Sequence, residues 1–371
     1  MRVLLAPDSF KGTLTAAEVA HSLARGLRGA AGEVVIDELP LSDGGEGLID
    51  TALRCGYHQV PLVAAGALGV PRPTRYARRG SEAIIEMAEC CGIQQVVPSP
   101  STAGGSTSLG VGQAIAHALD AGATNVVIGV GGSASTDGGA GLLAGLGAVG
   151  LGADLTAGGG ALIDVRSVDL DPLHPGLRRT RIVLASDVDN PLLGDTGAAR
   201  VYGPQKGADA ATVAQLEQAL EQWVAALTSG GRPDARELAR STGAGAGGGT
   251  GFGALLVGAH YRPGVAHVLA LTNFKARAAQ ADLIITGEGR LDGQTLHGKA
   301  PYGVARAAAG SGVPVIAVCG QNVLEPEHIR TARFSEVHAL YETPPASTAD
   351  SARLLTNIGA QIGARWRIQQ L

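Results

Sequence analysis

The 371-residue chain has little lysine, few aromatic side chains and no long basic run. Only four of its 29 basic residues are lysines, and basic residues never stand more than two together. With a net charge of −4, this distribution argues against nucleic acid or an anionic membrane as a partner. Twelve aromatic residues are also too few to suggest base-stacking platforms.

Long hydrophobic segments and cysteine motifs are missing as well. The longest uncharged apolar run, residues 138–153, is glycine-rich, whereas a membrane span needs about 18–20 strongly apolar residues. Asp8 and Lys11 follow the first residues too closely for a signal peptide. The four cysteines contain no C-x-x-C pair, which argues against zinc or a disulfide framework. We expect a soluble, cytoplasmic protein.

Glycine is in excess: 56 of the 371 residues are glycine, about 15%, where about 7% is usual. Glycine lets a backbone approach a ligand closely, and consecutive N–H groups in glycine loops bind phosphate. Turns in a glycine-biased chain are the competing interpretation of any single cluster. The clusters, most of which carry a carboxylate, are 43–47, 131–141, 243–249 and 287–293.

Hydrophobic patterning predicts an α/β fold with two domains. The two ends of the chain supply five strands that alternate with helices, which favours a flavodoxin-like parallel sheet built from residues 1–62 and 281–371. Residues 63–280 are too many for a loop, so we predict a second α/β domain inserted into the first. The expected strands are 3–6, 33–39, 282–286, 313–318 and 336–340 in the first domain, with 125–130 and 181–185 in the second.

The polar clusters follow the carboxyl ends of these expected strands, which is the edge where open α/β sheets bind ligands. The position of the clusters therefore predicts one ligand-binding region. Its candidate contacts are Asp8, Ser9, Asp43, Gly44, Gly45, Glu46, Gly131, Gly132, Ser133, Asp137, Glu288, Arg290 and Asp292.

Two segments come close to known nucleotide motifs. Residues 293–299 spell G-x-x-x-x-G-K, but Ala300 replaces the usual Ser or Thr and the expected strand ends too early, at Thr286. This argues against a true P-loop, although Gly298 and Lys299 before a helix can still hold a phosphate. Residues 129–134 weakly resemble a dinucleotide fingerprint, so an NAD(P)-dependent oxidoreductase is one alternative function.

The four lysines differ in their surroundings. Lys11, Lys206 and Lys299 each adjoin a glycine, and their retention in an arginine-rich chain suggests contact with phosphate. For Lys206, a structural role is the alternative to contact with phosphate. Lys275 has no such setting and is expected on the surface.

Two aspartates, Asp187 and Asp189, follow the expected strand 181–185. Such a pair can hold Mg²⁺ or accept a hydroxyl proton, and an Asx-turn before Pro191 is equally compatible with it.

Several long motifs, in order along the chain, resemble the bacterial glycerate kinase family of the type that makes 2-phosphoglycerate. APDSFKGTLTA at 6–16 is similar to the first family signature, and PLSDGGEG at 40–47 to the second. In GVGGSASTDGGAG at 129–141, Ser135-Thr136 stands where the family has Thr-Asn. Further matching blocks lie at 185–208, 243–253 and 282–305.

The resemblance implies ATP- and Mg²⁺-dependent phosphorylation of D-glycerate in glyoxylate or sugar-acid breakdown. We expect the site between the two domains, in a monomer or homodimer. As hypotheses, Lys11, Asp43, Asp187 and Glu288 are catalytic, with Asp187 accepting the hydroxyl proton. A non-catalytic organic-acid-binding protein is the second alternative. If the protein is a kinase, we expect Mg²⁺ near Asp8, Asp43 or Glu288. We expect the phosphates to contact Lys11 or Lys299, and Arg290 to bind the substrate carboxylate.

Overall fold

The computed structural model describes residues 1–30, 32–42, 44–342 and 348–369 of the chain. These residues form two compact units: residues 1–43 with 265–371 make unit 1, and residues 44–264 make unit 2. The units divide the chain at 43/44 and 264/265, whereas the sequence-based boundaries lie at 62/63 and 280/281. Those sequence-based domain boundaries stay a prediction.

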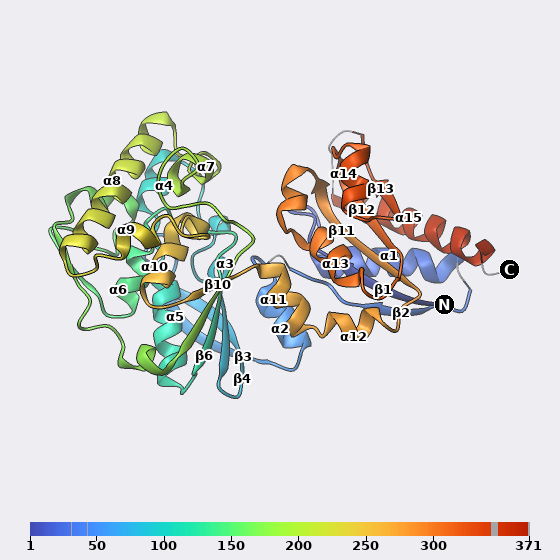
Figure 1. Cartoon of the computed structure of the whole chain (residues 1–371), viewed down its shortest axis with the longest axis horizontal. Coiled ribbons are helices and arrows are strands. Elements are labelled where there is room, and N and C mark those ends of the chain that lie inside the picture. Colours follow the sequence, from blue (N-terminus) through green and yellow to red (C-terminus); the bar gives the residue numbers. More distant parts are fainter. Residues whose placement is uncertain (31, 43, 343–347, 370–371) are drawn as a thin grey trace. The chain divides into compact units, whose positions relative to one another are not determined.

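Unit 1 is built on a five-stranded, fully parallel sheet (Figure 1). Its strand order is β13-β12-β11-β1-β2. Numbered within the unit this order is 5-4-3-1-2, the flavodoxin-like order that the sequence predicts. The strands are β1 (Arg2–Pro7), β2 (Val35–Glu38), β11 (Leu283–Leu291), β12 (Val315–Asn322) and β13 (Glu336–Ala339).

Helices cover this sheet because both of its faces are apolar. Val3 and Leu5 belong to one buried cluster, which Leu23 and Leu355 complete from α1 (Ala16–Ala30) and α15 (Thr348–Gln369). Leu4, which points to the opposite face, is also buried. The other helices of the C-terminal segment are α11 (Gly264–Leu271), α12 (Phe274–Ala278), α13 (Ala300–Ala308) and α14 (Pro326–Thr331).

The capping box predicted at the start of α1 is present. The Thr15 backbone N–H donates to Glu18 Oε2 at 2.8 Å, and the Glu18 N–H donates to Thr15 Oγ1 at 3.2 Å. These reciprocal bonds satisfy two N–H groups that the first helical turn leaves without intrahelical partners.

Unit 2 has a mixed six-stranded sheet in the order β10-β9-β6-β5-β4-β3. The first four strands in this order are parallel, whereas β4 pairs antiparallel with both β5 and β3. The bounds are β3 (His58–Ala65), β4 (Pro71–Arg79), β5 (Glu82–Glu86), β6 (Asn125–Gly129), β9 (Arg181–Ala185) and β10 (His260–Arg262), with β7 (Val149–Leu151) and β8 (Ser167–Asp169) in a separate ribbon.

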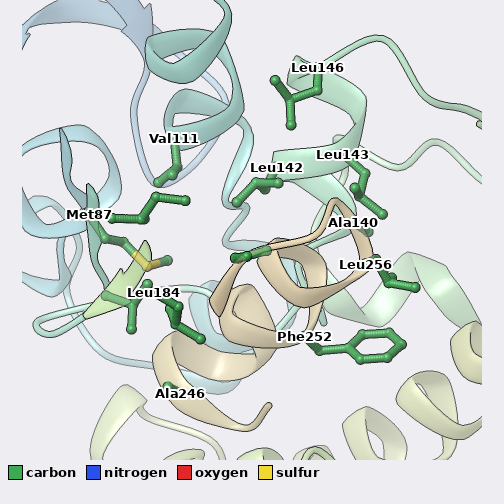
Figure 2. Packing of buried hydrophobic residues seen from close by; sticks show 14 of the residues in the cluster. Met87, Val111, Ala140, Leu142, Leu143, Leu146, Leu184, Ala246, Phe252 and Leu256 are labelled. Carbon is green, nitrogen blue, oxygen red and sulfur yellow. The ribbon is translucent and has the colours of Figure 1, made fainter. Parts of the chain in front are cut away.

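Helices of unit 2 enclose a second apolar core beside the sheet. Figure 2 shows Met87, Val111, Leu142 and Phe252 in this core, contributed by four different helices. The helices are α2 (Leu48–Arg54), α3 (Met87–Cys91), α4 (Pro100–Gly105), α5 (Leu109–Asp120), α6 (Ala140–Gly145), α7 (Ala198–Tyr202), α8 (Ala210–Ser229), α9 (Ala235–Leu238) and α10 (Thr250–Leu256).

The close contact between α1 and α15 generates a stability prediction (Figure 1). A Cβ atom at Gly26 would lie 2.0 Å from the Thr356 carbonyl oxygen, whereas a Cβ atom at Gly29 would meet nothing within 4 Å. Gly26→Ala forces two helix backbones apart, so we expect a loss of roughly 1–3 kcal/mol of unfolding free energy. Gly29→Ala, the matched control, should be neutral or gain up to about 1 kcal/mol. Urea unfolding of both variants checks this, and equal stabilities would contradict it.

Candidate active site

A cavity of about 370 Å³ lies in unit 1 at the carboxyl ends of β1, β11 and β12. The strand order reverses direction between β1 and β11. Open α/β sheets bind their ligands at this switch point, outside the carboxyl ends of the strands. The cavity therefore lies where the fold favours a ligand, and its volume suits a small one.

Two carboxylates that line the cavity are almost fully buried. Asp8 is 4% exposed and Glu288 is 6% exposed. Asp8 Oδ1 accepts the Ser9 backbone N–H at 2.6 Å, and Glu288 Oε1 accepts the Thr295 hydroxyl at 2.5 Å. Burial raises the pKa of Glu288, while the Lys299 charge and the Thr295 hydrogen bond act in the opposite direction. A buried carboxyl with a perturbed pKa in a cavity is a typical functional candidate.

Cationic side chains line the same cavity. Lys299, immediately before α13, has its Nζ 3.5 Å from Glu288 Oε2 and 3.6 Å from Asp292 Oδ1. Lys11 and Arg290 also line the cavity, and Arg290 is largely exposed. Positive charge can therefore face an anionic ligand beside the two buried acids.

The structure brings much of the predicted ligand region together within unit 1. The predicted residues that line the cavity are Asp8, Ser9, Lys11, Glu288, Arg290 and Lys299, and Asp292 joins them through its ion pair with Lys299. Asp43 lies outside the described residues. Sequence reasoning missed Thr295, Gln321, Tyr341 and Ser351. The position of Gln321, near the end of an expected strand, was a usable signal, but Tyr341 and Ser351 lie outside every glycine cluster.

One local expectation is wrong: β11 does not end at Thr286. The strand continues to Leu291 because its residues keep pairing with β12, as Arg290 does with Gln321. Glu288 and Arg290 therefore lie on an extended strand rather than in a loop. Since β1 ends at Pro7, this extension projects beyond its neighbour and helps to form one side of the cavity.

In unit 2, Asp137 organises the predicted glycine loop from inside. Its carboxylate accepts the backbone N–H and hydroxyl of Ser108 at 2.7 and 2.8 Å. It also accepts the N–H groups of Gly139 and Gly141 at 3.1 and 3.2 Å. Burial raises the pKa of Asp137, and these hydrogen bonds counteract the effect. The carboxylate thus holds the start of α6 and the start of α5 together.

Lys206 is also directed into unit 2 and is only 3% exposed. Its ammonium donates to Ser133 Oγ at 2.9 Å and to the Ser135 carbonyl oxygen at 2.5 Å. Burial lowers the pKa of Lys206 to about 8, although the nearby Asp137 charge opposes that shift. These contacts favour a role in shaping the loop 131–137, and contact of Lys206 with a ligand stays a prediction.

Other predicted residues of unit 2 lie at the carboxyl ends of its parallel strands. Gly131 follows β6, and a Cβ atom there would lie 2.6 Å from the Gly45 Cα, so the two predicted glycine loops touch. Glu46 accepts a hydrogen bond from Gln94 at 3.2 Å. Asp187 follows β9 and is half-buried. The charge of Asp187 adds to burial in raising the pKa of Tyr261 to about 12.

Fold and cavity together define an α/β protein with a small, charge-lined cavity at the switch point of a flavodoxin-like sheet. A sequence model of the glycerate kinase family matches residues 3–367. Glycerate kinase from Bacillus subtilis is 40% identical over 328 residues, covering 86% of this chain and 85% of that protein. The chain therefore belongs to the glycerate kinase family.

Two further relatives agree with this assignment. Glycerate 2-kinase from Escherichia coli is 37% identical over 328 residues, covering 86% of this chain and 85% of that protein. A Salmonella typhimurium LT2 crystal structure, provisionally named glycerate kinase 2, is 34% identical with a TM-score of 0.80. That likeness covers 100% of this chain and 99% of the other.

Membership of the family makes the chain a transferase that phosphorylates a hydroxyl of glycerate, and it implies ATP as the phosphoryl donor. The predicted family, fold class and enzyme class are thereby confirmed. The comparisons lend no support to an oxidoreductase or to a non-catalytic organic-acid-binding protein. Within the described parts of the chain, no helix has the length and apolarity needed to cross a membrane.

The buried ammonium of Lys206 generates a prediction about pH. The native state releases this proton near pH 8, whereas the unfolded chain keeps it to about pH 10.4. Between about pH 8 and pH 10.4 the unfolded state therefore binds more protons than the native state. The free energy of unfolding should rise with pH across this range, and the whole rise is on the order of 3 kcal/mol. In Lys206→Met this rise of the unfolding free energy with pH should be absent. In the control Lys275→Met, which changes an exposed lysine, the rise should remain. Urea unfolding from pH 7 to 10 checks this, and parallel curves for the two variants would contradict it.

Proposed function

We propose that the protein transfers the γ-phosphoryl group of ATP to the C2 hydroxyl of D-glycerate and releases 2-phosphoglycerate. Family membership supports transfer to glycerate, and the E. coli relative named glycerate 2-kinase supports the C2 position. The observation that carries the proposal is the unit 1 cavity, where buried acids and lysines from three segments line one small space.

Charge neutralisation is the first requirement of phosphoryl transfer, because negative charge is spread over the transferred group. Lys299 and Lys11 line the cavity and supply two compact ammonium groups for phosphate oxygens. Arg290 presents a guanidinium, whose fork of donors suits a carboxylate such as that of glycerate. We assign these three side chains to binding and to neutralising the reacting anions.

Magnesium fits the donor set of this cavity. Among the described residues, no group of three or more His, Cys, Asp and Glu side chains could hold a metal ion. Mg²⁺ bound to a nucleotide, however, usually needs only one or two protein carboxylates beside phosphate oxygens and water. Asp8 and Glu288 are the carboxylates that would hold it here, with Asp43 as the further candidate from the sequence. When bound, Mg²⁺ neutralises charge on the phosphates.

Unit 2 contributes proposals that come from its sequence pattern. Backbone N–H groups of residues 44–46 and 131–133 are assigned to phosphate or substrate binding. Asp187 is assigned to accept the proton of the attacking hydroxyl, since it follows a strand end and is half-buried. Ser133 is a less direct candidate, because its hydroxyl already accepts a hydrogen bond from Lys206.

The reaction itself is tested by incubating the purified protein with ATP, Mg²⁺ and D-glycerate and identifying the product. We expect ADP and 2-phosphoglycerate in equal amounts, and ³¹P NMR separates this product from 3-phosphoglycerate. Formation of 3-phosphoglycerate would overturn the assignment of the C2 hydroxyl. No product, together with NAD(P) reduction by a hydroxy acid, would instead favour the oxidoreductase.

The role of the cavity is tested by comparing two lysines. Lys299→Gln removes a charge that faces the cavity, so we expect kcat to fall by roughly 10²-fold and the KM for ATP to rise. Lys275→Gln removes a charge from an exposed position of α12 and should leave both constants unchanged. Steady-state kinetics check this, with urea unfolding to show that both variants fold. Equal activities would remove Lys299 from the site.

A further inference from the structure

Glu86 is a buried carboxylate that no sequence motif indicated. It is the last residue of β5, where it pairs in register with Gly129 of β6, and it is only 3% exposed. Both of its carboxylate oxygens accept backbone hydrogen bonds from the segment that opens α2. Oε1 accepts the N–H of Gly47 and Oε2 accepts the N–H of Ile49, each at 2.9 Å.

These two hydrogen bonds replace a missing helix cap. Residue Gly47 is the N-cap of α2, and no side-chain hydrogen bond from this N-cap closes the helix start. The first N–H groups of a helix have no intrahelical partners and need acceptors when they are buried. Glu86 supplies those acceptors from a strand 37 residues further along the chain.

The segment that Glu86 holds is the glycine loop 44–47. Gly44 and Gly47 have φ values of 86° and 88°, which only glycine adopts without strain. A Cβ atom at Gly129 would lie 2.4 Å from the Gly44 carbonyl oxygen, so the loop rests directly on the end of β6. Glu86 and Gly129 are neighbours on adjacent strands. Gly129 lets the loop lie close to the end of β6, and Glu86 fixes the backbone where the loop enters α2.

We propose that Glu86 is a positioning residue for the kinase reaction. Its ionised carboxylate holds the loop 44–47 in the conformation that lets Gly44, Gly45 and Glu46 contact a ligand. The inference rests on the proposed function, which assigns those three residues to binding. Glu86 itself acts through the backbone of the loop and not on the reacting atoms.

The chemistry of this contact makes it sensitive to pH. A carboxylate accepts two N–H groups, whereas a protonated carboxyl turns one oxygen into a donor and leaves one N–H without an acceptor. Burial raises the pKa of Glu86 to about 7, and the two backbone hydrogen bonds oppose this shift. The loop is thus held by both bonds above about pH 7 and by fewer below it.

The charged groups around Glu86 come from three elements. Glu89 on α3 and Asp50 on α2 raise the pKa of Glu86 further. Arg75 on β4 pairs with both of these carboxylates, at 2.6 Å and 3.0 Å, and so limits their effect. In the neighbouring strand, β6, the residue beside Glu86 is Gly129, which cannot titrate.

Two variants of similar chemistry separate positioning from general stability. Glu86→Gln keeps one acceptor but places an amide NH₂ against the loop N–H groups and cannot titrate. Glu89→Gln, three residues away, removes a partly exposed carboxylate that contacts Arg75 instead of the loop. We expect Glu86→Gln to lower kcat/KM by about 10- to 100-fold at pH 8, the effect of a misplaced binding loop, and Glu89→Gln to change it less than threefold.

The pH dependence of kcat/KM gives the first readout. In the wild type, kcat/KM should decline as pH falls through about 7. In Glu89→Gln the same decline should be present but lie at lower pH, because loss of the Glu89 charge lowers the pKa of Glu86. In Glu86→Gln the decline of kcat/KM that comes from protonation of Glu86 should be absent. A decline that comes from protonation of ATP itself should persist in all three proteins. A purely structural role for Glu86 would lower activity in the variant and leave the shape of the profile unchanged, which would overturn the proposal.

Hydrogen exchange of the ligand-free protein gives a second readout that does not depend on activity. After correction for the intrinsic effect of pH, the amides of Gly47 and Ile49 in the wild type should exchange faster at pH 6 than at pH 8. In Glu86→Gln they should exchange fast at both values. Unchanged exchange in the wild type overturns the proposal even where the variant fails to fold. Absence of glycerate phosphorylation by the wild type counts against the proposed function alone, because the exchange result stands without it.

Discussion

Buried charges that bind backbone groups are the constraint on which the glycine loops of this protein depend. A glycine loop has no side chains with which to fix itself, and its N–H groups must find acceptors wherever water is excluded. In unit 2, Asp137 gathers N–H groups from the starts of α5 and α6, and Glu86 gathers those that open α2. Lys206 complements them by binding the oxygens of Ser133 and Ser135. The loops 44–47 and 131–141 are therefore each held by hydrogen bonds to a buried charged side chain.

Unit 1 uses charge in another way. Asp8, Glu288 and Lys299 line a cavity, and the contacts of Lys299 are ion pairs longer than hydrogen bonds, at 3.5 and 3.6 Å. The same residue types thus support backbone loops in unit 2 and line a cavity in unit 1.

The sequence predicted the sheet of unit 1 well because its strands are short, continuous apolar runs separated by helices. The hairpin β3–β4 was missed because Arg72, Arg75 and the prolines of β4 conceal the alternation of buried residues such as Thr74 and Tyr76. Within the candidate site, strand-end positions grouped Asp8, Lys11 and Glu288, and the glycine beside Lys299 singled out that lysine; all four line one cavity. Sequence pattern could not reveal that Asp137 and Lys206 point inward, or that Glu86 is buried against the start of α2, since direction and burial are set by tertiary packing.

The pairing of β1 with β11 has a consequence for synthesis of the chain. Val3 lies beside Leu283, so the first strand has β2 as its sole partner until the ribosome has passed the whole of unit 2. At about 5–20 residues per second this interval lasts roughly ten seconds to a minute. The residues of unit 2 are contiguous, from 44 to 264, and are complete before β11 emerges. During this interval the apolar strand β1, Arg2–Pro7, has β2 and α1 as native neighbours but lacks β11 on its other edge.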